Sequence, residues 1–165
     1  QLSPDDADAL TARGAAFLKL NELERAENDL MEAEKIEPAN PVIQKNIQQL
    51  DSTRQSKQQE KVEATRQLQS NRNSIAALNQ RATASVSLGE VEQAITDSER
   101  VLRRSSRNVT AYANLAEAYL HKGDTTSARV VLKRAQRKGI KLEDIEVVRP
   151  LMVDMVRKKN QKPPR

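Results

Sequence analysis

The chain has 165 residues, with 28 basic and 23 acidic side chains and a formal net charge of +5, a length that suggests one domain or two small ones. Aromatic residues make up 2% of it and there are four glycines, which argues against β-sandwiches and barrels and leaves mostly helix-forming residues. The absence of cysteine excludes a disulfide framework, a thiolate zinc site and a cysteine nucleophile, and the single histidine, His121, is too few for a histidine-rich metal site.

A period of 34 residues runs through most of the sequence. The segments 7–40, 75–108 and 109–142 align in phase, each with a small residue in a first helix, a turn residue and an alanine in a second helix: Gly14, Asn21 and Ala26, then Ala82, Gly89 and Ala94, then Ala116, Gly123 and Ala128. The first two segments lie 68 positions apart, which is two periods. The stretch between them is therefore one period whose pattern has decayed.

Each unit is predicted to be a pair of antiparallel helices. The small residues let the two helix axes approach closely. Asn21, Gly89 and Gly123 can adopt a positive φ at the end of the first helix. Because one pair cannot bury its apolar face alone, neighbouring pairs must stack, so we expect an all-α fold of stacked antiparallel helix pairs.

The decayed period, 41–72, is predicted to form one long polar helix. It would dock onto the first pair through Val42, Ile43, Ile47 and Leu50 and then project, because a polar tract follows from Ser52. The alternative is a continuous solenoid with a polar second helix in this unit. If the single long helix forms, Asn71 to Ser74 is a break before the next helix.

The C-terminal part is predicted to close the stack. Residues 143–159 have apolar side chains at helical spacing and should form a capping helix, interrupted at Pro150. Residues 160–165 should be disordered because Pro163 and Pro164 prevent a helix.

The periodic residues resemble the tetratricopeptide repeat. The resemblance is carried by Leu10, Gly14, Phe17, Ala26, Ala33 and Pro38 in segment 7–40, by Leu78, Ala82, Gly89 and Ala94 in segment 75–108, and by Tyr112, Ala116, Tyr119, Gly123, Ala128 and Ala135 in segment 109–142. It implies a right-handed α-solenoid that acts as a scaffold or adaptor between proteins. The cationic residues with which tetratricopeptide co-chaperones hold a C-terminal carboxylate are missing from the matching positions.

The sequence contains few residues or motifs that could support catalysis. No phosphate-binding glycine loop, HExxH or GxSxG motif is present. His121 stands at the C-terminal end of a predicted helix, where its interaction with the helix dipole explains its presence without a catalytic role. We therefore expect no enzyme activity, no cofactor and no metal site.

A binding function fits the sequence better than an enzymatic one. Stacked helix pairs curve, and their first helices line the concave face, where a partner can bind. The predicted partner-binding groove consists of Asn79, Thr83, Val86, Thr110, Asn114, Glu117 and Leu120. Asparagine amides pair readily with a peptide backbone, so we expect the groove to hold a peptide or a helix of another protein.

Charge is unevenly distributed, with a net −6 over residues 1–40, +2 over 41–96 and +9 over 97–165. The predicted basic surface consists of Lys133, Arg134, Arg137, Lys138, Lys141, Arg157 and Lys158. It fits an acidic protein partner or a second copy of the chain. The alternative function is a basic helical-repeat component of a nucleic-acid or ribonucleoprotein complex, although the tyrosines sit at core positions of the repeat rather than beside the cations, where stacking on bases would need them.

No stretch of the sequence is long and apolar enough to cross a membrane. The sequence begins at Gln1 rather than Met, which we interpret as a processed or excised chain. We expect a soluble chain, cytoplasmic or, after removal of a leader, secreted or periplasmic.

Overall fold

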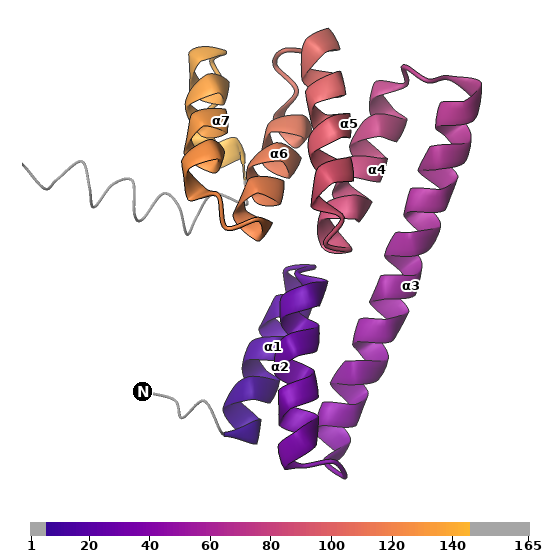
Figure 1. Ribbon diagram of the computed structural model, residues 1–165, viewed down its shortest axis with the longest axis vertical. Helices are drawn as coiled ribbons and strands as arrows, with labels where there is room; N and C mark the ends of the chain where they lie inside the picture. The colour runs from indigo at the N-terminus through magenta and orange to yellow at the C-terminus, as the bar shows by residue number, and fades with distance from the viewer. Residues whose placement is uncertain (1–5, 146–165) are drawn as a thin grey trace, which may run out of the picture.

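The computed structural model describes residues 6–145, which fold into α-helices and one short 3₁₀ turn. The helices are α1 (Ala7–Lys19), α2 (Leu23–Ile36), α3 (Pro41–Ser70), α4 (Ile75–Ser87), α5 (Val91–Arg104), α6 (Val109–His121) and α7 (Thr125–Arg137), followed by the turn η1 (Leu142–Asp144). The helices α1 and α2 form one antiparallel pair, and α4 to α7 form two more that stack side by side (Figure 1). The expected stack of helix pairs is confirmed.

Most helices begin at a residue whose side chain caps them. The side-chain oxygens of Asp6, Asn40, Ser74, Asn108 and Asp124 accept hydrogen bonds from backbone N–H groups in the first turns of their helices. These bonds satisfy donors that the helix cannot pair internally. The turn after the first helix of each pair has a positive φ, at Asn21 (58°), Gly89 (74°) and Gly123 (75°).

The small residues of the repeat lie where the helices of a pair cross. Ala82, Ala94, Ala116 and Ala128 are at most 1% exposed. At Gly14 an added Cβ would lie only 2.8 Å from Cγ of Leu30 on α2. In the α1–α2 pair, Leu30 therefore fills the space that a side chain at Gly14 would occupy.

The helix α3 runs unbroken through the whole decayed period. The position that corresponds to Asn21, Gly89 and Gly123 holds Gln55, which can continue a helix. The positions of the small residues hold Gln48 and Glu60, which are too large to let two helices approach. The period cannot fold back on itself, and the expected single helix, about 45 Å long at 1.5 Å per residue, is confirmed.

One stripe of α3 faces the rest of the molecule, and its chemistry changes along the helix. Its first part, Ile43, Ile47 and Leu50, packs on α1 and α2, while Leu68 near its end joins the core of α4 to α7. The expectation that Val42 docks was wrong, since it is 57% exposed and lies one residue off this stripe. The second half of α3 packs along α4 rather than projecting into solvent.

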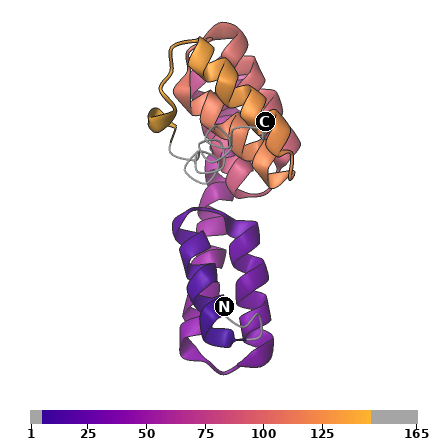
Figure 2. The same cartoon turned by 90° about the vertical axis from the view of Figure 1, so that its left-hand side faces the viewer.

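The middle of the stripe is cationic and marks the junction between the two blocks. Arg54 forms an ion pair with Glu27 of α2 at 2.7 Å, and Lys61 forms one with Glu90 in the α4–α5 turn. Figure 2 shows α1, α2 and the first half of α3 as one block, joined through α3 to the block of α4 to α7. At the junction Leu88 packs against the core of the first block. The α1–α2 turn is thereby held against the second block.

The described residues contain no helix that is both long and apolar enough to span a membrane. The expected capping helix lies almost wholly outside the described residues; its first positions form the 3₁₀ turn η1 instead of an α-helix. The expected tail, 160–165, also lies outside them.

Candidate functional site

A hollow of about 470 Å³ lies between the first helices of the last two pairs and the α1–α2 turn. Its walls come from α4 and α6, and the turn residues Leu20 and Asn21 close one side, with Lys57 of α3 and Asp144 of η1 also contributing. The lining residues are Leu20, Asn21, Lys57, Thr83, Ser87, Val109, Thr110, Ala113, Asn114, Glu117 and Asp144. We call this hollow the α4–α6 groove; it depends on both blocks because α3 brings the α1–α2 turn to it.

A hydrogen-bond network fastens α4 to α6 at the wall of the groove. The amide nitrogen of Asn114 lies 3.0 Å from Thr83 Oγ1 and 3.4 Å from the carbonyl oxygen of Asn79. The Asn79 side chain in turn donates to Asn108, which caps α6. Asn114 is only 4% exposed. These amides therefore hold the two helices in register, although the side-chain oxygen of Asn79 is buried without a hydrogen-bond partner among the described residues.

The structure brings four of the seven predicted groove residues to the groove: Thr83, Thr110, Asn114 and Glu117. Asn79 lies behind it, in the α4–α6 contact. Val86 was misplaced, since it is 3% exposed and packs with Ala94 and Ala118. The groove face of α4 continues from Thr83 with a step of four residues, to Ser87, and this step turns Val86 toward α5 and α6. Leu120 packs against the main core.

Sequence reasoning missed the side of the groove that the first block supplies. Leu20 stands in the α1–α2 turn and is 61% exposed. It reaches the groove only because α3 is straight and sets the distance between the two blocks. No local pattern around Leu20 or Lys57 carries that information. Ser87 follows from helical spacing once the groove face is known.

Glu117 is the electrostatically unusual residue of the groove. Burial, and secondly the negative charge of Glu22 in the α1–α2 turn, raise the pKa of its carboxyl group to about 7. Among the described residues it has no ion-pair partner within 4.0 Å. Near neutral pH this side chain can therefore switch between donating and accepting a hydrogen bond.

The predicted basic surface lies partly on α7 and the loop after it. Lys133, Arg137, Lys138 and Lys141 are exposed there. Arg134 is half-buried instead: it forms an ion pair with Glu99 of α5 at 2.9 Å and lies over the ring of the buried Tyr112. Arg134 therefore ties α7 to the rest of the fold. Arg157 and Lys158 lie outside the described residues.

Within residues 6–145, no cluster of three or more histidine, aspartate or glutamate side chains is arranged to hold a metal ion. The groove offers hydroxyl and amide groups, apolar side chains, the carboxyl groups of Glu117 and Asp144 and the ammonium group of Lys57. Such a surface suits recognition of a peptide segment.

Comparison with known proteins identifies the repeat. The tetratricopeptide repeat family matches over residues 7–40 and again over 79–142. Among solved structures, MamA D159K mutant 1 is similar, with 17% identity and a TM-score of 0.46 over 80% of this chain and 77% of that one. A tetratricopeptide repeat protein from Parabacteroides merdae ATCC 43184 is also similar, with 23% identity and a TM-score of 0.45 over 78% of this chain. The present chain spans about half (51%) of the length of that protein.

A search of curated proteins found no match. The two family matches together cover more than half of the sequence; they include segments 7–40 and 109–142 in full and residues 79–108 of segment 75–108. On these matches the chain belongs to the tetratricopeptide repeat family.

Proposed function

We propose that the chain is a non-catalytic adaptor that binds a peptide or helix of a partner protein in the α4–α6 groove. The observation that carries the proposal is the hollow of about 470 Å³ on the face of the first helices, closed on one side by the α1–α2 turn. A groove bounded on three sides buries more of a peptide than an open face does, and buried contacts dominate binding.

The groove residues divide into two roles in this proposal. Thr110 presents its hydroxyl group to the backbone of the bound segment, and Glu117 pairs with a donor on it. The Ser87 hydroxyl donates to the carbonyl oxygen of Thr83 and offers the segment an acceptor only. Leu20, Val109 and Ala113 contact its apolar side chains. Asn114 and Asn79 act indirectly, by holding α4 and α6 at the right separation.

The exposed cations of α7 are proposed to assist by attracting an acidic part of the partner. Lys133, Arg137 and Lys138 lie on the helix next to α6. Charges at the rim of an interface mainly raise the association rate, and salt screens them. The same surface could meet the acidic first block of a second copy. The nucleic-acid alternative is the weaker one because Tyr112 is fully buried beneath Arg134 and offers no face for stacking.

A photo-crosslinking amino acid placed at Ala113 tests the proposal. It should capture a partner from the native source, and the same amino acid at the exposed Arg66 on α3 should not. The variant Ala113→Arg, which fills the groove, should compete poorly for that partner while its circular dichroism and melting temperature stay unchanged. Equal capture from both positions, or undiminished competition by a folded Ala113→Arg, would show that the partner binds elsewhere.

A further inference from the structure

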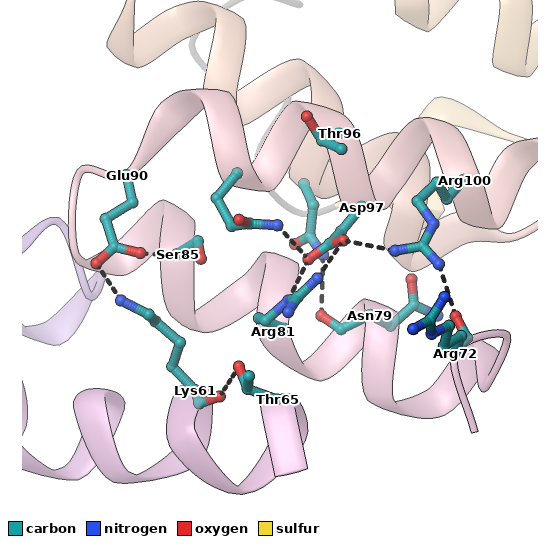
Figure 3. Close-up of polar contacts among 12 residues, drawn as sticks. Lys61, Thr65, Arg72, Asn79, Arg81, Ser85, Glu90, Thr96, Asp97 and Arg100 are labelled. Carbon is teal, nitrogen blue, oxygen red and sulfur yellow. Dashed lines mark hydrogen bonds and ion pairs between the residues drawn. The ribbon is translucent and has the colours of Figure 1, made fainter. Parts of the chain in front are cut away.

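A second hollow, of about 350 Å³, lies where the end of α3 meets α4 and α5, and three arginines line it. Its lining is Thr65, Leu68, Gln69, Arg72, Arg81 and Arg100, and it shares no residue with the α4–α6 groove. We call it the arginine hollow. Figure 3 shows Arg81 and Arg100 on either side of Asp97, with Arg72 beyond Arg100.

Within residues 6–145, Asp97 is the one acid that bonds to these arginines, and its hydrogen bonds are with Arg81. The guanidinium group of Arg81 binds Asp97 through two hydrogen bonds of 2.7 and 2.9 Å, and the amide of Gln93 donates a third at 3.0 Å. Asp97 is fully buried. Arg81 and Asp97 thus form a neutral pair below the surface of the hollow.

Arg100 and Arg72 add two positive charges that this pair does not balance. The nearest nitrogen of Arg100 is 3.8 Å from Asp97, which is beyond hydrogen-bond distance, and its other terminal nitrogen donates to the backbone carbonyl oxygen of Arg72 at 2.6 Å. Among residues 6–145, Arg72 has no acid within ion-pair distance. That backbone bond holds two guanidinium-bearing residues together against their mutual repulsion.

The first helix pair shows that the buried ion pair does not require this extra charge. Arg13 binds Asp29 there through two hydrogen bonds of 2.6 Å, at the positions equivalent to Arg81 and Asp97. The position equivalent to Arg100 is Glu32, which pairs with Lys35 on its own helix. An acid at this position is therefore compatible with the helix pair. In the third pair the equivalent residue is Arg134, whose charge is balanced by Glu99 at 2.9 Å. Arg100 differs from both because no acid lies within hydrogen-bond distance of it among the described residues.

We propose that the arginine hollow binds an oxyanion, a phosphate or carboxylate group. Arg100 and Arg72 supply the charge, the unused N–H groups of Arg81 supply directed donors, and the Gln69 amide completes the lining. Planar guanidinium groups match the geometry of both oxyanions. The site is separate from the proposed groove, and either can fail without the other.

Inorganic phosphate is the probe for this site, read by NMR of the ¹⁵N-labelled full chain at constant ionic strength. Side-chain Nε–H signals of Arg81 and Arg100 should shift saturably with sodium phosphate and stay in place with sodium chloride. Arg100→Glu, which copies Glu32 of the first pair, should weaken binding by about tenfold or more, the loss of at least one charge-assisted hydrogen bond. The matched control is Arg103→Glu, the same charge change at an exposed position of the same helix outside the hollow, and it should leave the affinity within about twofold, as a screened rim charge does.

A parallel titration with sodium acetate distinguishes the two sources of the oxyanion: saturation by acetate as well as phosphate assigns carboxylate recognition, and saturation by phosphate alone assigns phosphate. Arg100→Gln serves as a second variant should Arg100→Glu alter the circular dichroism spectrum. The proposal is overturned if neither anion saturates, if Arg103→Glu weakens binding as much as Arg100→Glu does, or if the shifts spread evenly over the exposed cations of α7.

Discussion

Arg81 holds Asp97 in a two-hydrogen-bond ion pair that repeats, 68 positions later, the pair formed by Arg13 and Asp29. The chemistry is identical and the surroundings are not. The Arg81 and Asp97 side chains are 16% and 0% exposed, whereas those of Arg13 and Asp29 are 61% and 10% exposed. The two pairs therefore allow the effect of burial to be measured within one protein.

Replacing Arg81 with methionine should destabilise the protein by about 3 kcal/mol, because a buried carboxylate loses its main partner. This is near the lower end of the range for breaking buried pairs, since Gln93 and Arg100 remain close to Asp97. Urea unfolding at neutral pH measures it. The matched variant Arg13→Met should cost clearly less because water screens that pair. Equal losses in the two variants would mean that burial does not set the strength of the bridge.

The straightness of α3 should determine how far apart the two blocks lie. Because the chain has no cysteine, single cysteines can be introduced cleanly at Glu32 and Arg103, both exposed and on different blocks, and spin-labelled. Distance measurement by electron–electron resonance should give one narrow distribution. Gln55→Pro, which removes a hydrogen bond from the middle of α3, should broaden it and cost about 3 kcal/mol.

The control for this experiment is Gln55→Ala, which keeps the helix and should keep the narrow distribution. A narrow distribution in Gln55→Pro would contradict the prediction. It would mean that the contacts at the junction, such as the ion pair of Arg54 with Glu27, hold the blocks in place without help from the helix.

The repeat could be found from the sequence because its features are local and recur in phase. Gly89 and Gly123 stand at the turns of two pairs with a positive φ, and small residues such as Ala82 and Ala94 are buried in each pair. The sequence also favoured a single long helix over 41–72, because no glycine or proline follows Pro41 in that stretch, but it allowed a continuous solenoid as well, and the structure decided between the two. Helical periodicity and turn chemistry were sufficient for the three helix pairs.

The candidate site was predicted only in part because two of its determinants are not local. The position of Leu20 depends on the whole length of α3, and the burial of Asn114 depends on how closely α4 approaches α6. Val86 failed for a smaller reason: a step of three residues instead of four along α4 rotates a side chain from the groove into the core. Rotations of this size are set by packing, which a repeat pattern does not record.

Ser98→Ala should stabilise the protein. Ser98 is fully buried, and its hydroxyl group has no hydrogen-bond partner among the described residues. Removing a buried hydroxyl that makes no bond should raise the free energy of unfolding by about 1 kcal/mol, with a smaller gain from the higher helix propensity of alanine. Thermal and urea unfolding measure the change.

Ser85→Ala is the control for that prediction, because Ser85 is equally buried but its hydroxyl group donates to Glu90 at 3.3 Å. It should be neutral or destabilising. A stabilising effect of the same size in both variants would assign the gain to helix propensity and not to the unsatisfied hydroxyl.

Glu117 should make stability fall as the pH rises toward 7. Its carboxyl pKa is raised in the folded state to about 7 from the ordinary value of 4.5. Folding therefore carries no penalty from this group below about pH 4.5, where it is protonated in both states, and the penalty grows until the folded-state carboxyl ionises near pH 7. The full loss is about 3 kcal/mol. Urea unfolding at pH 5 and pH 8, compared with Glu117→Gln, isolates this contribution because the other titrating groups are common to both proteins.

The cause of the raised pKa can be tested in the same way. Burial is its larger cause and the charge of Glu22 the smaller one, so Glu22→Gln should move the pH dependence to lower pH without abolishing it. If the pH profiles of wild type and Glu117→Gln are parallel, Glu117 is ionised at pH 5 in the folded protein. The groove would then carry a fixed negative charge, and its proposed partner would need a cation at that position at every pH.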